Sequence, residues 1–194
     1  MTTDLLIVDT GAANTASVRA AFTRLGLTTR VSADATEVAA AGRVVLPGVG
    51  SFGPAMERLV AAGLDQVLIE RVRAQAPLLA ICLGLQLLCS GSDEAPDTAG
   101  LGCLAGRVTA FPPDVLAPQL GWNAVEPLSD EGLLTAGHAY YANSYRLTEL
   151  PEGWRVATSW HGEPFVAALE RGGVLACQFH PELSSAWGAS LLQR

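Results

Sequence analysis

Cys82 is the residue of this 194-residue chain whose surroundings best suit an enzyme nucleophile. It stands in the uncharged run "LLAICLGLQLL" (78–88), between a segment typical of a buried strand and one typical of a helix. A nucleophile on such a turn needs small residues two positions before and after it, because strand and helix approach closely there. Ala80 and Gly84 meet this need. The helix dipole would favour the reactive thiolate, although a cysteine that only fills the core has the same pattern.

The motif "QFHPE" (178–182) supplies a candidate base and a group to orient it. In extended backbone His180 and Glu182 project to the same side, so the carboxylate can orient the imidazole and stabilise its cation. A nucleophile, a base and an orienting acid are the parts of a catalytic triad. His138 and His161 are rivals for the base, and we interpret both as surface or turn histidines. The alternative for the motif itself is an exposed strand end.

The segment "LPGVGSFG" (46–53) runs from a buried strand into closely spaced glycines. Glycines let the backbone approach a ligand closely, or turn a peptide so that its N–H points inward. A phosphate-binding loop is one interpretation, but the Walker lysine is missing. We therefore favour a backbone donor to an oxyanion, acting together with the N–H of Leu83. An ordinary strand-to-helix turn is the alternative.

Alternating strand-like and helix-like segments must position these residues. Apolar strand-like runs lie at 5–9, 28–32, 44–48 and 77–82, and helix-like patterns follow them at 15–25, 34–41, 54–74 (with a break near 63) and 83–89. This alternation predicts a parallel sheet with helices on both faces. After about Gly100, short strand-like segments predict an antiparallel or mixed extension, and 184–194 a final helix. We expect a single α/β domain over 1–194, a three-layer α/β/α sandwich with a mixed, mostly parallel central sheet.

The composition narrows the classes of function. A net charge of −7 disfavours nucleic-acid or anionic-membrane partners, which require a basic face, and favours a small metabolite or a protein partner. The four cysteines include no C-x-x-C pair and the N-terminal segment carries Asp4, so we expect a cytoplasmic protein with reduced thiols. The uncharged stretch 74–92 has the length of a membrane span, but it contains Pro77 and Gly84, and we interpret it as a strand plus a helix.

Taken together and in this order, the glycine segment, the cysteine turn and "QFHPE" resemble the class I (triad) glutamine amidotransferases, which have a flavodoxin-like fold. The finer pattern is similar to one branch of that family, the glutaminase subunits of histidine biosynthesis. The further matching pieces are "IVDTGAANTASV" (7–18), "PQLGWNAV" (118–125), "NSY" (143–145) and "GEPFVAAL" (162–169). They span nearly the whole chain.

The resemblance implies that Cys82 attacks the side-chain amide of glutamine, giving a thioester and ammonia, and that water then releases glutamate. It implies that His180 moves the proton and Glu182 orients it. The backbone amides of Val49 and Leu83 would form the oxyanion hole. No metal and no cofactor is expected. The residues at positions where the family holds glutamine are Gly48, Gly50, Gln86, Glu94, Ser144 and Tyr145.

The resemblance also implies a protein partner. Ammonia released into water would become unreactive ammonium, and the family passes it directly to a (β/α)8-barrel cyclase subunit. A heterodimer is therefore expected, with Asn14, Trp122 and Asn123 toward its interface.

Departures from the family pattern bear on the partner and on the glutamine pocket. Ala80 replaces the usual glycine of the turn, Leu183 replaces a common basic residue, and Asn143 stands where histidine is frequent. Two alternatives are a glutaminase of vitamin B6 or aminobenzoate synthesis, which "GWN" and "NSY" fit less well, and a catalytically idle binding subunit. A glutamine-analogue electrophile would distinguish an enzyme from an idle subunit by the cysteine that it labels.

Overall fold

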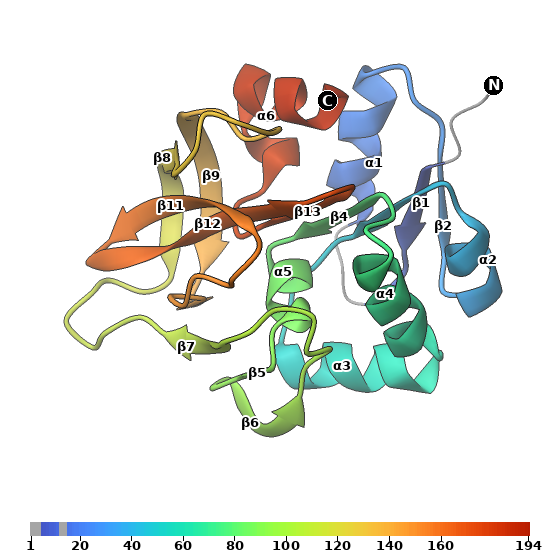
Figure 1. Ribbon diagram of the computed structural model, residues 1–194, viewed down its shortest axis with the longest axis horizontal. Helices are drawn as coiled ribbons and strands as arrows, with labels where there is room; N and C mark the ends of the chain where they lie inside the picture. Colours follow the sequence, from blue (N-terminus) through green and yellow to red (C-terminus); the bar gives the residue numbers. More distant parts are fainter. Residues whose placement is uncertain (1–4, 12–14) are drawn as a thin grey trace.

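The computed structural model describes residues 5–11 and 15–194. Its main feature is a nine-stranded sheet with the order β2-β1-β3-β4-β13-β12-β11-β8-β9 (Figure 1). Five neighbouring strands pair in parallel: β2 (Thr29–Ser32), β1 (Leu5–Val8), β3 (Arg43–Leu46), β4 (Leu78–Ile81) and β13 (Val174–Cys177). Most of their residues are buried apolar side chains, because helices cover both faces of a parallel sheet.

The other four strands extend the sheet in antiparallel fashion, as expected for the second half of the chain. They are β12 (Glu163–Arg171), β11 (Arg155–His161), β8 (Gln119–Pro127) and β9 (Gly137–Asn143). Strand β13 joins the two halves, since it pairs with β4 in parallel and with β12 in antiparallel orientation. The residues that follow β13 are thereby brought beside those that follow β4.

Helices cover the two faces of the parallel half. Helices α1 (Thr15–Arg24) and α6 (Ser185–Gln193) pack on one face, and α2 (Ala35–Ala40), α3 (Phe52–Ala61), α4 (Leu64–Arg73) and α5 (Leu83–Leu88) pack on the other. The alternation of side chains along β1 shows this division. Ile7 packs in the cluster with Phe22 of α1, and Leu6 packs in the cluster with Leu59 of α3. The three-layer α/β/α prediction is confirmed.

A second, small sheet lies beside α5 and was not predicted. Its strands, in spatial order, are β10 (Tyr145–Arg146), β7 (Arg107–Ala110), β5 (Gly91–Ser92) and β6 (Ala95–Ala99). A short 3-10 helix, η1 (Pro181–Leu183), follows the last strand and precedes α6.

Two local predictions are confirmed. The helical stretch 54–74 is interrupted at Gly63, whose φ of 65° lies in the left-handed region that glycine tolerates. The uncharged stretch 74–92 folds as β4 and α5, and within the part of the chain that the structure describes no helix is long and apolar enough to cross a membrane.

Candidate active site

Cys82 occupies a strained turn between β4 and α5. Its φ of 52° and ψ of −107° are unusual for a residue with a side chain, and such a conformation costs about 1–3 kcal/mol and persists only where the surroundings enforce it. The surroundings do so here. The Cys82 N–H donates to the Cys177 carbonyl at 2.7 Å, and a Cβ on Gly84 would lie 2.3 Å from the Leu46 carbonyl oxygen. The tight strand-to-helix turn predicted from Ala80 and Gly84 is therefore present.

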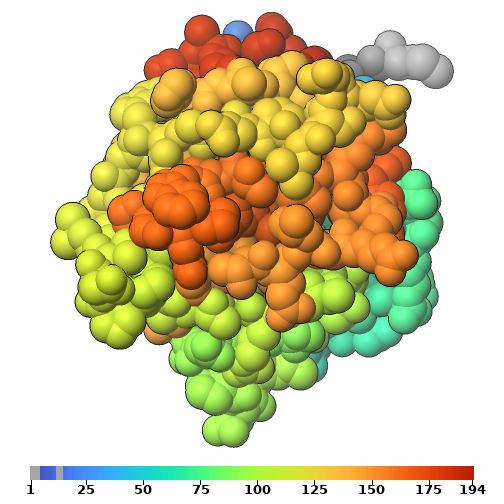
Figure 2. Space-filling view, turned by 60° about the vertical axis from the view of Figure 1, so that its left-hand side comes forward, coloured from blue at the N-terminus to red at the C-terminus, as the bar shows by residue number. Residues whose placement is uncertain are grey.

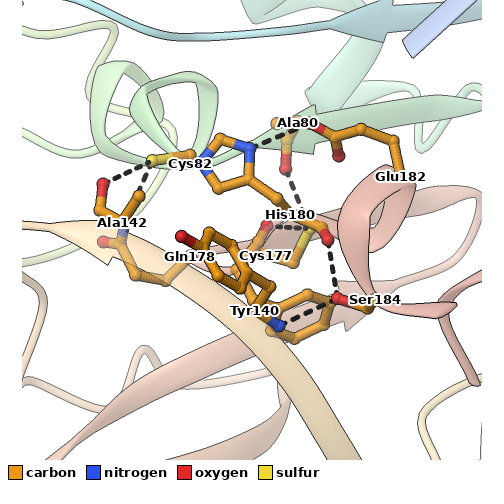
Figure 3. Close-up of polar contacts among 10 residues, drawn as sticks. Ala80, Cys82, Tyr140, Ala142, Cys177, Gln178, His180, Glu182 and Ser184 are labelled. Atoms are coloured by element: carbon orange, nitrogen blue, oxygen red, sulfur yellow. Dashed lines mark hydrogen bonds and ion pairs between the residues drawn. The ribbon is translucent and has the colours of Figure 1, made fainter. Parts of the chain in front are cut away.

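His180 and Glu182 form a buried pair next to this turn. The Glu182 Oε1 atom accepts a hydrogen bond from the His180 Nδ1 atom at 2.9 Å, and their side chains are 4% and 7% exposed. Figure 3 shows the imidazole between Cys82 and Glu182. Burial alone would lower the pKa of the His180 imidazole, but hydrogen bonds to the Cys82 and Glu182 side chains raise it to about 10. The imidazole is thus held as a cation beside the sulfur at neutral pH.

Gln178 is a further contact of the sulfur, which our interpretation of the sequence missed. Its Nε2 atom lies 3.5 Å from the Cys82 Sγ atom, and its side chain is completely buried. The sulfur also lies 4.0 Å from the Ala142 carbonyl oxygen (Figure 3). The signal was available in the motif, because alternation along an extended segment places position 178 on the same side as His180.

Gln86 connects this group to the predicted glutamine pocket. Its Nε2 atom donates to the Tyr145 carbonyl at 3.1 Å and to the Gln178 Oε1 atom at 3.0 Å. A primary amide carries two N–H donors and one oxygen acceptor. Both donors are used inside the protein, so the Gln86 Oε1 atom is the part of this side chain left for a ligand.

In this conformation the two predicted donors do not form an oxyanion hole. The Leu83 N–H donates to the Gly48 carbonyl oxygen at 3.4 Å. A Cβ on Gly48 would lie 2.4 Å from the Gly84 nitrogen, so the glycine segment packs directly against the first turn of α5. An inward Val49 N–H requires the 48–49 peptide to turn over, which rotates the Cα–C bond of Gly48 and the N–Cα bond of Val49, and a glycine at 48 tolerates the changed conformation.

A cavity of about 220 Å³ brings the predicted glutamine-binding residues together. All six of them line it, although they come from four separate segments of the chain. The lining residues are Gly48, Val49, Gly50, Cys82, Leu83, Gln86, Glu94, Ala142, Asn143, Ser144, Tyr145 and His180. A volume of this size suits a single small metabolite.

A backbone N–H group holds the Glu94 side chain in the cavity wall. Its Oε2 atom accepts a hydrogen bond from the Phe52 N–H at 3.0 Å, at the N-terminus of α3.

Gly48, Gly50 and Gly53 match the spacing of a dinucleotide-binding loop, which would place phosphate at the N-terminus of α3. Because the Glu94 carboxylate already occupies it, the structure argues against that function for the segment.

The rival histidines lie away from Cys82. His138 is exposed on β9, and the His161 Nε2 atom lies 2.7 Å from the Leu116 carbonyl oxygen. His161 is also followed two residues later by a carboxylate, but Glu163 forms its ion pair with Arg146. Neither histidine lines the cavity.

Over residues 5–11 and 15–194, no group of three or more His, Cys, Asp or Glu side chains could hold a metal ion.

The predicted interface residues Trp122 and Asn123 lie on β8, beside exposed apolar side chains. Trp122 is 54% exposed, and the Asn123 Nδ2 atom donates to the Trp160 carbonyl at 2.7 Å. Together with Leu120 and Trp160 these residues line a surface hollow of about 560 Å³. Figure 2 brings forward this side of the molecule, built by the antiparallel half of the sheet. Asn14 lies outside the described residues.

Comparison with known proteins gives one consistent family. Residues 6–193 match the family described as glutamine amidotransferase class-I. The chain is 42% identical over 192 residues to "Imidazole glycerol phosphate synthase subunit HisH" of Symbiobacterium thermophilum, covering 97% of this chain and 91% of that protein. It is 41% identical over 196 residues to the protein of the same name from Deinococcus radiodurans, with the same two coverages.

Solved structures with lower sequence identity share the fold. The structure of PurLQS from Thermotoga maritima matches with a TM-score of 0.76 at 15% identity, over 100% of this chain and 97% of that one. A crystal structure described as a glutamine amidotransferase matches with a TM-score of 0.74 at 22% identity, over 97% and 95% of the two chains.

Proposed function

Because this chain belongs to the class-I glutamine amidotransferase family, we propose that it is the glutaminase subunit of an imidazole glycerol phosphate synthase, which hydrolyses glutamine to glutamate and ammonia. The observation that carries the proposal is that Cys82 and His180 line one cavity and that Glu182 pairs with the imidazole from behind. This arrangement holds a thiol, a cationic imidazole and an orienting carboxylate in the order that acyl transfer requires.

In the first half of the reaction, the Cys82 thiolate attacks the side-chain carbonyl carbon of glutamine. The imidazolium of His180 donates its proton to the amide nitrogen as the carbon–nitrogen bond breaks, which releases ammonia and leaves a thioester. Amide nitrogen is a poor leaving group unless it is protonated. A raised pKa for His180 therefore suits the role of acid in this step.

In the second half, the neutral imidazole removes a proton from water, and the resulting hydroxide attacks the thioester carbon. The carbon–sulfur bond breaks, Cys82 departs as the thiolate, and glutamate leaves. Glu182 accepts a hydrogen bond from the Nδ1 atom throughout, which keeps the other ring nitrogen directed at the reacting atoms.

Both tetrahedral intermediates carry a negative oxygen. The backbone N–H groups of Leu83 and Val49 are the proposed donors to it, once the 48–49 peptide has turned and the Leu83 N–H has left the Gly48 carbonyl. Glutamine itself occupies the cavity. There the Glu94 carboxylate suits its α-ammonium group, and the free Gln86 Oε1 atom accepts a hydrogen bond.

The partner is a (β/α)8-barrel cyclase subunit that receives the ammonia. The exposed Trp122 and Trp160 side chains support this proposal, because large apolar side chains exposed beside one another favour a protein–protein contact. Asn123 belongs to the same proposed interface. For Asn14, which lies outside the described residues, the resemblance alone supports a place in it. Leu183, an exposed residue that directly follows Glu182, takes the place of a basic residue and removes one polar contact.

A glutamine-analogue electrophile tests the nucleophile directly. Burial raises the pKa of Cys89 to about 12 and also raises the pKa values of the Cys103 and Cys177 thiols, which disfavours the reactive thiolate at all three. Labelling followed by peptide mass spectrometry should find the adduct on Cys82. An adduct on any of the other three cysteines would overturn the assignment.

A further inference from the structure

We propose that Gln178 acts in the glutaminase reaction as a hydrogen-bond donor to the Cys82 sulfur, and that Gln86 fixes the Gln178 amide in the orientation this requires. The inference rests on the proposed function, since it concerns the same nucleophile. It adds a second side-chain donor to the sulfur, besides the imidazole.

The Tyr145 carbonyl oxygen can only accept a hydrogen bond, and this fixes the orientation of both the Gln86 and the Gln178 amide. The Tyr145 carbonyl faces the Gln86 Nε2 atom at 3.1 Å, so this end of the Gln86 amide must be the NH2 group. The second N–H of that group donates to Gln178 at 3.0 Å, so the Gln178 atom facing it must be the oxygen. The Gln178 NH2 group therefore faces the sulfur, 3.5 Å away.

Burial makes this arrangement costly to lose. Gln178 is completely buried and Gln86 is 5% exposed, so water does not replace a missing partner. A neutral thiol is a weak acceptor, whereas an anionic acceptor forms hydrogen bonds about twice as strong as a neutral one. The Gln178 amide is better satisfied when Cys82 is a thiolate, and it stabilises that form in return.

The donor acts at the two points where the sulfur carries charge. Before attack it holds the thiolate in the cavity. When the thioester breaks down, the sulfur leaves with the electron pair of the carbon–sulfur bond, and the Gln178 N–H stabilises this leaving group as its charge develops. The proposed chain of hydrogen bonds thus extends from Gln86 in the glutamine pocket, through Gln178, to the Cys82 sulfur.

Alkylation of Cys82 in the full chain tests the proposal without reference to glutaminase activity. Gln178→Met keeps the side-chain length and removes the donor. Ser159→Ala is the matched control, since Ser159 is buried and polar but does not line the cavity. The rate of iodoacetamide addition to Cys82 is measured by peptide mass spectrometry at neutral and at strongly alkaline pH.

We expect Gln178→Met to slow alkylation at neutral pH about tenfold, the value of a hydrogen bond to a charged group. At strongly alkaline pH, where the thiol ionises without help, the rates should agree within about twofold. Gln86→Met should slow the neutral reaction about threefold, because it frees the Gln178 amide to rotate without removing it. It also serves as the second variant if Gln178→Met does not fold.

Equal neutral rates for the parent and both folded variants would overturn the proposal. So would slowing of the same size at both pH values, since that would indicate only a displaced sulfur. Failure of the parent chain to react at Cys82 would instead contradict the proposed function, so the two failures are distinguishable.

Discussion

The Leu83 N–H donates to the Gly48 carbonyl oxygen at 3.4 Å, and one of the two proposed oxyanion donors is therefore occupied within the protein. The Cys82, His180 and Glu182 side chains are thus in place, whereas the oxyanion hole is not formed. Turning one peptide would exchange this carbonyl for the Val49 N–H, and Gly48, which has no Cβ, favours the turn.

The isolated chain should consequently hydrolyse glutamine slowly. Each missing oxyanion donor costs about 10²- to 10³-fold in turnover, and the proposed cyclase subunit should restore the rate. Glutamate release with and without that subunit measures the difference. Full activity of the isolated chain would show that the 48–49 peptide does not limit catalysis.

The close packing of Gly84 predicts a large effect on stability. Gly84→Ala places a Cβ 2.3 Å from the Leu46 carbonyl oxygen, and overpacking of this kind should lower the free energy of unfolding by about 2–3 kcal/mol. Gly42→Ala is the matched control, because a Cβ there meets no atom within 4 Å. Urea denaturation compares the two, and equal midpoints would mean that the turn relaxes easily.

The backbone strain at Cys82 makes a second prediction about stability. Cys82→Ala and Cys82→Gly should both abolish glutamine hydrolysis. The glycine variant should be more stable than the alanine variant by about 1–2 kcal/mol, since only glycine adopts a φ of 52° with a ψ of −107° without strain. Thermal unfolding of the two variants measures this difference. The reverse order would indicate that the turn is unstrained.

The raised pKa of His180 predicts how stability depends on pH. The value rises from 6.5 to about 10 on folding, so the folded state binds this proton more tightly than the unfolded state does. The contribution is complete below pH 6.5 and is lost as pH rises toward about 10. Urea denaturation across this range should show a steeper decline in the parent chain than in His180→Gln, in which the buried thiols still contribute a decline. Parallel curves would contradict the assigned shift.

The layers, the parallel strands and the cysteine turn could be predicted from the sequence because each depends on local patterns. Apolar runs identify the buried strands, and Ala80 and Gly84 identify the turn. The small sheet could not be predicted in this way, since β5 and β6 are short, polar strands that pair only in the folded context.

Within the site, two features escape residue-level reasoning for different reasons. The orientation of the 48–49 peptide is not encoded by residue type, because glycine permits both arrangements. The Gln178 contact depends on Gln86, which lies far away in the sequence, and alternation alone shows only the side on which the amide lies. Long-range packing decides both.

Trapping the thioester tests the central claim most directly. The chain with its cyclase partner is mixed with isotopically labelled glutamine, quenched in acid and digested for mass spectrometry. We predict a glutamyl group on Cys82 that hydroxylamine removes and that Cys82→Ala lacks. Release of glutamate with the label on another cysteine, or release from the Cys82→Ala variant, would contradict the account.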